Sequence, residues 1–339
     1  MRNIIPRAQV VESAARLYLE DQHAAVHSAA ELLLRRWGNT EILDRCDQRL
    51  KETGQRPLYK GWCTGPNEHT FAILTGPLAC RLGSPAEEEG REDHERAHYR
   101  RIDRTLAVST KEVTFDQFRR FQGDRIQKDR FATSPLCPVN NVTWYEGAAY
   151  CNWLTDQDPE LTKEDRCYAG NVKSGMRLVP DALERHGYRL PTEAEWEYFC
   201  RGNTITSRPF GESEELLPRF AWTWLNSQDR LHPVGLLLPN EFGLFDVLGN
   251  AYEWCHDGER GKRLDPYTPY PEGTRDHPAG DPDEGRATLD DTAWRMVRGG
   301  AYCYAPASSR SAARYAVYVT LHDPYMGFRV VRTLPKERD

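Results

Sequence analysis

The chain has 339 residues, a mass of 39.0 kDa and a formal net charge of −6, with 39% hydrophobic and 11% aromatic residues. At about 150 residues per domain, this length predicts one large domain with an appendage, or two domains. The apolar content suffices for a sizeable core and argues against global disorder. An acidic balance with a pI near 6.0 is not typical of nucleic-acid binding, so no nucleic-acid partner is expected.

The sequence also bears on the compartment. Mean hydropathy is −0.73, and no run approaches the roughly 20 apolar residues of a membrane span, so no membrane partner is expected. Acidic residues at Glu12, Glu20 and Asp21 interrupt the N-terminal region, which predicts that it is no signal peptide. Nine cysteines are scattered without any CxxC pair. Together these features predict a cytoplasmic protein with reduced thiols.

The first elements along the chain are helical. Residues 8–37 show the apolar spacing of two helices, with Asp21 placed to cap the second and Gly38 placed to end it. One such pair cannot bury its own faces, so we expect it to dock on the main domain or on a partner. The polar stretch that follows is expected to be a linker or a short third helix. The predicted parts are a helical pair at 1–38, a linker at 39–67, a main domain at 68–334 and a tail at 335–339.

From residue 68 onward, short apolar runs alternate with turn residues, which is typical of short strands. Helices are expected at 115–121, 144–154 and 192–200. The last of these begins with a capping-box pair, Thr192 and Glu195. Long polar loops are expected at 155–187 and 257–292. The chain is therefore predicted to be an α+β protein with little regular secondary structure, held together by aromatic packing.

Eight sequence strings carry a family resemblance. They are GSP at 83–85, EVTFDQFRRF at 112–121, PVNNVTWYEGAAYCNWL at 138–154, YRLPTEAEWEYFCRG at 188–202, PVGLLLPNEFGLFDVLGNAYEWCHD at 233–257, VRGGA at 297–301, RSAAR at 310–314 and GFRVVR at 327–332. In this order, over roughly residues 68–334, they resemble the formylglycine-generating enzyme (sulfatase-modifying factor) family. The resemblance implies a C-type-lectin-like core. The family includes copper oxidases, iron-dependent sulfoxide synthases and non-catalytic binders such as retroelement variable proteins, so the fold leaves the function open.

The family's redox metal sites are not evident in this sequence. Copper members hold Cu(I) between two cysteines that lie between the RGG and AAR strings. Here that segment contains Cys303 alone. Iron members use three histidines, whereas His23 and His27 have a chelating spacing without a third ligand. We therefore expect neither copper nor iron and lean towards a protein that is not an enzyme, with Cys303 and His322 as weak catalytic candidates.

An oxidoreductase remains open as the alternative. It would use copper or non-haem iron on a thiol or cysteine substrate, with Cys303 beside His322 or His256. The adjacent Cys255 and His256 point in opposite directions in an extended segment, which argues against a nucleophilic pair.

The string His94-Glu95-Arg96-Ala97-His98 matches HExxH, which on a helix would place two imidazoles on one face beside a general base. Its surroundings are charged on all sides and lack the apolar stripe of a buried helix. We therefore expect a solvated charged loop rather than a zinc site.

A structural calcium ion is also implied by the resemblance. Matched residue by residue to the family's GN-x-x-EW loop, the ligands would be Asp246, Gly249, Ala251 and Glu253. Oxygen ligands from a tight glycine turn suit Ca²⁺. The simpler interpretation is a turn in which Glu253 caps backbone N–H groups. The family's second calcium loop is shortened around Asn226, so a second ion is not expected.

The segment Ala301–Met326 occupies the position of the family's pocket and is rich in tyrosine and serine. Tyrosine gives a large contact area at low entropic cost, and serine supplies adaptable hydrogen bonds. The predicted partner-binding residues are Tyr302, Tyr304, Ser308, Ser309, Tyr315, Tyr318, His322 and Tyr325. We expect a non-catalytic module that binds a protein or peptide within a bacterial signalling or defence assembly, with the helices at 8–37 as a docking element. A purely structural subunit is the third possibility.

Overall fold

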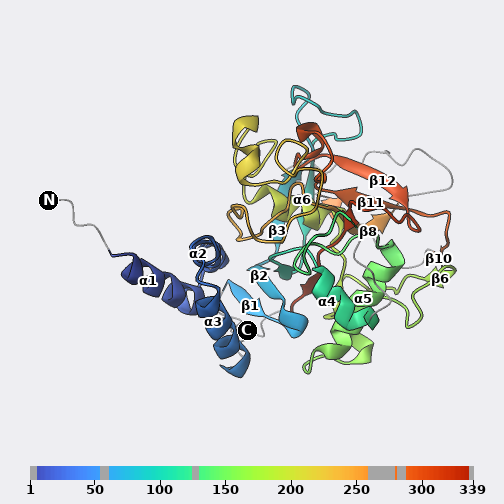
Figure 1. The fold of residues 1–339 in the computed structure, drawn as a ribbon. Coiled ribbons are helices and arrows are strands. Elements are labelled where there is room, and N and C mark those ends of the chain that lie inside the picture. Colours follow the sequence, from blue (N-terminus) through green and yellow to red (C-terminus); the bar gives the residue numbers. More distant parts are fainter. Residues whose placement is uncertain (1–5, 54–60, 124–129, 259–278, 281–287, 336–339) are drawn as a thin grey trace.

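The computed structural model describes residues 6–53, 61–123, 130–258, 279–280 and 288–335. It is a mixed helix-and-strand molecule whose N-terminal helices lie to one side of the strand-containing body (Figure 1). The predicted α+β class is confirmed. Much of the loop predicted at 257–292 lies outside the described residues, as does most of the tail predicted at 335–339.

Three helices, rather than two, precede the first strand. They are α1 (Arg7–Glu20), α2 (Ala24–Arg36) and α3 (Thr40–Thr53). The third helix forms because Leu43, Cys46 and Leu50 lie at helical spacing and are all buried. The segment expected as a linker at 39–67 therefore holds α3 and also strand β1 (Trp62–Thr64), which pairs with the main sheet.

The main sheet has five antiparallel strands in the order β1-β2-β5-β14-β7. The bounds of the other four are Thr70–Leu74 for β2, Leu106–Ser109 for β5, Tyr188–Arg189 for β7 and Val331–Thr333 for β14. One face, with Ala72 and Val108, shares a core with α1–α3. The opposite face, with Phe71 and Ala107, packs in a second core with helix α5 (Trp144–Gln157).

The N-terminal helices dock on the main domain through buried polar contacts as well as the shared core. The hydroxyl of Ser28 on α2 donates to the carbonyl of Gly243 at 2.8 Å. The indole N–H of Trp62 donates to the carbonyl of Asp21 at 2.8 Å. Of the two docking modes expected from the sequence, the structure shows docking on the chain itself.

A second sheet of four strands, ordered β12-β11-β8-β13, carries the segment expected to bind a partner. Its strands are β8 (Tyr252–Gly258), β11 (Trp294–Arg298), β12 (Arg314–Tyr318) and β13 (Met326–Gly327). Figure 1 shows β8, β11 and β12 on the side of the molecule away from α1–α3. Smaller pairings join β3 (Leu78–Leu82), β4 (His98–Ile102) and β9 (Ala279–Gly280), and β6 (Met176–Arg177) with β10 (Thr288–Leu289).

The remaining helices begin at capping boxes. They are α4 (Phe115–Gln122), α5 and α6 (Glu193–Arg201), so the helices predicted at 115–121, 144–154 and 192–200 are confirmed. In α6 the Thr192 hydroxyl accepts from the Glu195 backbone N–H, while the Glu195 carboxylate accepts from the Thr192 backbone N–H. Short 3-10 helices are η1 (Pro66–Glu68), η3 (Lys163–Asp165), η4 (Glu214–Arg219) and η5 (Pro306–Ser308). Within the described ranges, every helix is too short or too polar to cross a membrane.

Candidate functional site

Three buried arginines hold the backbone of the segment Ala301–Met326. Arg208, Arg298 and Arg310 are each at most 3% exposed. Their guanidinium groups donate to the carbonyl oxygens of Pro306, Ala307, Ser309, Ser311, Ala312 and Ala313. A planar guanidinium presents five donors in a fixed geometry, so each arginine holds several peptide groups at once. The loop between η5 and β12 is therefore held in a fixed shape by these three arginines, one of which, Arg310, belongs to the loop itself.

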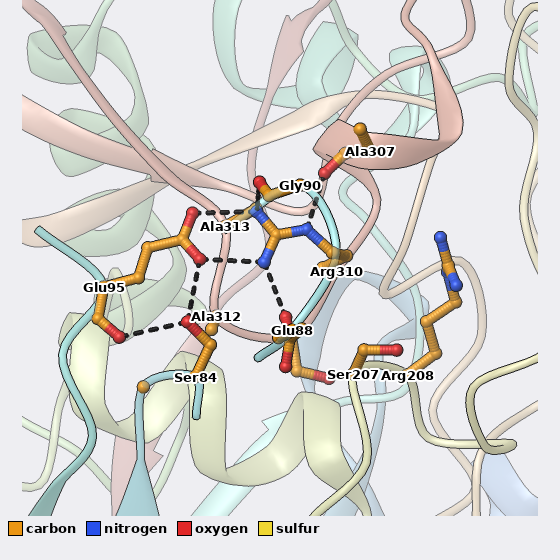
Figure 2. A network of polar contacts seen from close by, with 12 residues as sticks. Ser84, Glu88, Gly90, Glu95, Ser207, Arg208, Ala307, Arg310, Ala312 and Ala313 are labelled. Atoms are coloured by element: carbon orange, nitrogen blue, oxygen red, sulfur yellow. Dashed lines mark hydrogen bonds and ion pairs between the residues drawn. The ribbon is translucent and has the colours of Figure 1, made fainter. Parts of the chain in front are cut away.

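Arg310 also ties this segment to the loop between β3 and β4 (Figure 2). Its two terminal nitrogens bind both carboxylate oxygens of Glu95, at 2.8 and 2.9 Å. The same nitrogens reach a carboxylate oxygen of Glu88 and the carbonyl of Gly90, each at 2.6 Å. All of its donors are thus used, and the two loops form one rigid unit.

This contact corrects the expectation of a solvated loop at His94–His98. Glu95 is 3% exposed, and its carboxylate is occupied by Arg310 and the Ser84 hydroxyl. The segment forms turns and an isolated bridge rather than a helix. Burial lowers the pKa of both His94 and His98. Glu95 is therefore a structural anion, and the histidines are not arranged as in a helical zinc site.

The eight predicted partner-binding residues are not equally accessible. Tyr302, Ser308 and Ser309 are buried, which corrects their assignment to a binding surface. Tyr304, Tyr315 and Tyr325 are half-buried, while Tyr318 and His322 are exposed. Tyr302 points into a small core, where its ring lies 5.7 Å from that of Phe131. The structure thus leaves five of the eight available for contact with a partner.

The half-buried tyrosines gather around a fourth, Tyr252, which the sequence analysis did not single out. The Tyr252 ring lies edge-on to those of Tyr304, Tyr315 and Tyr325, at 5.1, 5.6 and 6.2 Å. Burial raises the pKa of Tyr252, Tyr315 and Tyr325, so the phenols stay neutral near pH 7. The cluster therefore presents aromatic rings and hydroxyl groups to its surroundings.

Two exposed apolar residues adjoin this cluster. The backbone N–H of Trp224 donates to the carbonyl of Tyr304 at 3.2 Å. The Trp224 side chain is 61% exposed and that of Leu225 is 56% exposed. Large apolar side chains at such exposure, next to half-buried aromatics, are typical of interaction sites. The sequence signal was the pair of tryptophans in Ala221–Leu225, which the sequence analysis did not use. We call Tyr304, Tyr325, Trp224 and Leu225 the aromatic surface.

The weak catalytic candidates lie in unlike surroundings. Burial, with the negative charges of Asp229 and Asp323, raises the pKa of the Cys303 thiol to about 11. The Nδ1 atom of exposed His322 lies 2.9 Å from the carbonyl oxygen of Asn141. A thiol with a raised pKa is a poor nucleophile and a poor metal ligand at neutral pH.

His256 belongs to a different part of the fold from Cys303. It is buried in the core around α5, 3.2 Å from the Tyr168 hydroxyl. Burial, with the charge of Arg295, lowers its pKa to about 3. In the part of the chain that the structure describes, no three His, Cys, Asp or Glu side chains converge as a metal cluster.

The two N-terminal histidines do not share a helix face. His23 precedes α2 in extended backbone and is exposed beside Asp21. His27 is buried between the rings of Tyr18 and Trp62, at 4.1 and 3.8 Å. Because one histidine is exposed and the other is enclosed by aromatic rings, the two do not form the metal-chelating pair that their spacing suggested.

The residues expected to bind calcium surround a buried concentration of negative charge. Glu253 accepts hydrogen bonds from the Arg329 guanidinium at 2.6–2.9 Å. Asp246 accepts from the Gly235 backbone N–H through Oδ2, while its buried Oδ1 has no hydrogen-bond partner in the structure. Burial raises the pKa of Asp246 to about 6. Burial and the charges of Asp246 and Glu253 raise the pKa of Glu112 well above its usual range.

Of these three carboxylates only Glu253 is hydrogen-bonded to Arg329, and Oδ1 of Asp246 has no hydrogen-bond partner in the structure. A divalent cation bound by oxygen atoms would compensate both the charge and the orphaned oxygen. The predicted set contains two carboxylates and otherwise backbone oxygens, so it fits Ca²⁺ in donor chemistry. The calcium site stays a prediction.

The fold and site together define a C-type-lectin-like protein with a tyrosine-rich surface gathered around Tyr252. Residues 56–334 match the model of the sulfatase-modifying factor enzyme 1-like domain. The chain therefore belongs to this family.

Similar proteins fall into several functional groups. The chain is 33% identical over 146 residues to chaperone protein LppX of Paenibacillus barcinonensis, covering 35% of this chain and 51% of that protein. It is 31% identical over 136 residues to the formylglycine-generating enzyme of Bos taurus, covering 36% of this chain and 28% of that enzyme. The chain thus spans about half or less of these curated relatives.

Two solved structures show the same fold. One is the Treponema denticola variable protein 1, with a TM-score of 0.59, 23% identity and coverage of 78% of this chain and 95% of that one. The other is PvdO from Pseudomonas aeruginosa, with a TM-score of 0.59, 22% identity and coverage of 80% and 98%.

Proposed function

We propose that this chain is a non-catalytic member of its family that binds a protein or peptide on the aromatic surface. The observation that carries the proposal is the exposure of Trp224 and Leu225 beside Tyr304. Rigid, amphipathic aromatic side chains supply most of the energy in many interfaces and lose little entropy on binding. The arginine-held backbone of the neighbouring loop supports a preorganised surface.

The partner is a polypeptide rather than a nucleic acid or a membrane. A net charge of −6 disfavours polyanions and anionic lipid. One relative is named a chaperone protein and another, from Chlamydia pneumoniae, a serine/threonine-protein kinase, which is consistent with a role in a bacterial signalling or defence assembly. All nine cysteines are free thiols, which supports a reducing compartment, the cytoplasm.

Position-specific photocrosslinking in cells of the source organism tests this function. A photoreactive amino acid replaces Trp224, and in a matched control it replaces Leu17, an exposed apolar residue on α1. We expect a discrete crosslinked partner from position 224 and none from position 17. The purified partner should bind the wild-type chain, and Trp224→Ala with Leu225→Ala should weaken that binding at least about tenfold. Equal crosslinking at both positions, or unchanged affinity, contradicts the proposal.

The oxidoreductase alternative has its own readout. Copper- or iron-loaded protein is supplied with a cysteine-containing peptide, and oxygen consumption is followed. Turnover that disappears in Cys303→Ser would replace the binding function with catalysis.

We also propose that Asp246, Gly249, Ala251 and Glu253 hold a structural calcium ion. The support is the Oδ1 atom of Asp246, which is buried without a hydrogen-bond partner, and the buried carboxylates of Glu112 and Glu253, whose charges act on one another. A bound ion would stabilise the turn before β8 and so the base of the aromatic surface.

A further inference from the structure

A cavity of about 150 Å³ lies against the five-stranded sheet, and none of its described lining residues belongs to the segment Ala301–Met326. Strands β1, β2, β5, β7 and β14 supply most of its wall. The lining residues used below are Cys63, Phe71, Ile73, Ala107, Arg332 and Leu334. This site is independent of the proposed function.

The strand register explains why the cavity exists. Ala107 pairs directly with Ile73 on one side and with Arg332 on the other. Directly paired residues point to the same face of a sheet, so these side chains form one row. Cys63 pairs with Phe71, two residues before Ile73, and so shares this face. The methyl group of Ala107 and the small thiol of Cys63 leave space between larger side chains.

Arg332 supplies the polar part of the wall. Its Nη1 atom donates to Asp158 at 3.1 Å, and its guanidinium lies 5.3 Å from the centre of the Tyr188 ring. Its Nε atom is buried and has no hydrogen-bond partner in the structure. Because Nε is not accessible from the cavity, the terminal nitrogens of this guanidinium, whose side chain is 11% exposed, are the donors that an acceptor atom on a ligand would meet.

The charges around the cavity favour an uncharged ligand. Asp158 already balances the charge of Arg332, and the acidic residue Glu160 also lines the cavity. An additional anion would meet a net negative environment among these described residues. The remaining wall is largely apolar, from Phe71, Ile73 and Leu334.

The size of the cavity limits the ligand. An apolar protein cavity of roughly 150 Å³ accommodates benzene. We propose that the cavity beside Ala107 binds a small, neutral, mainly apolar molecule with one hydrogen-bond acceptor, of the class of an aromatic ketone. Its ring lies against Phe71 and Ile73, and its carbonyl oxygen accepts a hydrogen bond from Arg332.

Protection of Cys63 from alkylation tests the proposal, with acetophenone as the probe. Cys63 lines the cavity, whereas the equally half-buried Cys80 lies on β3 and is an internal control. At about ten times its Kd, acetophenone should slow iodoacetamide labelling of Cys63 about tenfold, measured by mass spectrometry, and leave Cys80 unchanged. No protection up to the solubility limit, or equal protection of both cysteines, overturns the proposal.

Further probes and variants test separately the hydrogen-bond acceptor, the neutral charge of the ligand and the role of the cavity. Toluene, which lacks an acceptor, and benzoate, which is charged, should both protect Cys63 less than acetophenone. Benzoate protecting better would overturn the neutral class. Ala107→Leu fills the cavity and should abolish protection, with circular dichroism confirming its fold. If that variant does not fold, Arg332→Lys, which removes the planar guanidinium and its fixed set of donors, should weaken binding of acetophenone but not of toluene. Equal weakening of both would overturn the role of Arg332.

Discussion

Lys111 and Glu31 form a charge pair that joins the main domain to the second N-terminal helix. The ammonium nitrogen of Lys111 lies 2.5 and 2.7 Å from the two carboxylate oxygens of Glu31. Arg35 donates to the same carboxylate at 2.8 Å. Burial alone would raise the pKa of Glu31, but the charges of Lys111 and Arg35 outweigh it and lower the pKa to about 2. Glu31 is therefore ionised in the folded protein.

Removing Lys111 should destabilise the protein strongly. Lys111→Met leaves a buried carboxylate with Arg35 alone, and breaking a buried pair costs about 3–5 kcal/mol. Urea unfolding monitored by tryptophan fluorescence measures the loss. The control is the double variant Lys111→Met with Glu31→Gln, which removes the unpaired charge and should be less destabilised. Equal losses in the two variants would show that the charge pair is not the cause.

The same pair predicts a dependence of stability on pH. The folded pKa of Glu31 is about 2, below its ordinary value of 4.5, so its stabilisation is full above about pH 4.5 and is lost as the pH falls towards 2. The difference corresponds to at most about 3 kcal/mol. Urea unfolding of the wild type and Glu31→Gln should therefore differ most at about pH 6, differ less at about pH 3 and converge only as the pH falls to about 2. A constant gap would contradict the shift.

Two glycines test how closely α2 approaches the domain. Both Gly243 and Gly38 have left-handed backbone, with φ of +78° and +72°. A Cβ atom at Gly243 would lie 2.6 Å from the carbonyl group of Ala24, whereas one at Gly38 would meet nothing within 4 Å. Gly38→Ala should cost about 1–2 kcal/mol through its backbone alone. Gly243→Ala should cost a further 1–3 kcal/mol or so, because α2 must shift. Similar unfolding midpoints would argue against tight docking.

Cys303 should react as an unactivated thiol. Because burial, Asp229 and Asp323 raise its pKa to about 11, only a small fraction is thiolate at neutral pH. The rate of iodoacetamide labelling at Cys303, resolved by mass spectrometry, should keep rising with pH towards about 11. An inflection near pH 7 would instead indicate a nucleophile or a metal ligand.

Calcium should stabilise the chain through Asp246. An ion that binds only the folded state adds about 2.7 kcal/mol when its concentration is 100 times Kd. Thermal unfolding should therefore shift upward with calcium and return after chelation. Asp246→Asn, which keeps the shape but removes the charge, should reduce the shift, whereas the exposed carboxylate variant Asp291→Asn should not. A shift that is unchanged in Asp246→Asn would place calcium elsewhere.

The fold could be predicted from short-range features. The start of α6 could be predicted because Thr192 and Glu195, which form its capping box, lie only three residues apart in the sequence. The order of the family strings predicted the C-type-lectin-like core. Helix α3 was seen only as an option, because its apolar residues Leu43, Cys46 and Leu50 are few within a polar sequence.

The candidate site could not be predicted in the same way, because it is formed by contacts between residues that are far apart in the sequence. Glu95 was expected in solvent because its neighbours are charged, but its partner Arg310 lies 215 residues away. Trp224 joins the aromatic surface from a separate segment through a backbone hydrogen bond to Tyr304, and the buried Tyr252 supports that surface through a ring contact with Tyr304. Tyr302 was assigned to the surface by composition, although its side chain fills a core.

The three arginines that hold the loop after β11 donate hydrogen bonds to backbone carbonyl oxygens. Every amino acid has such an oxygen, whatever its side chain. Exchanging the exposed side chain of Ala307 would therefore leave the hydrogen bond to its carbonyl oxygen in place. The residues that set the shape of the loop, Arg208, Arg298 and its own Arg310, are thus distinct from its exposed side chains. This division should let the exposed positions of the loop accept substitutions without a change of backbone shape, so that variants with new binding properties can be selected.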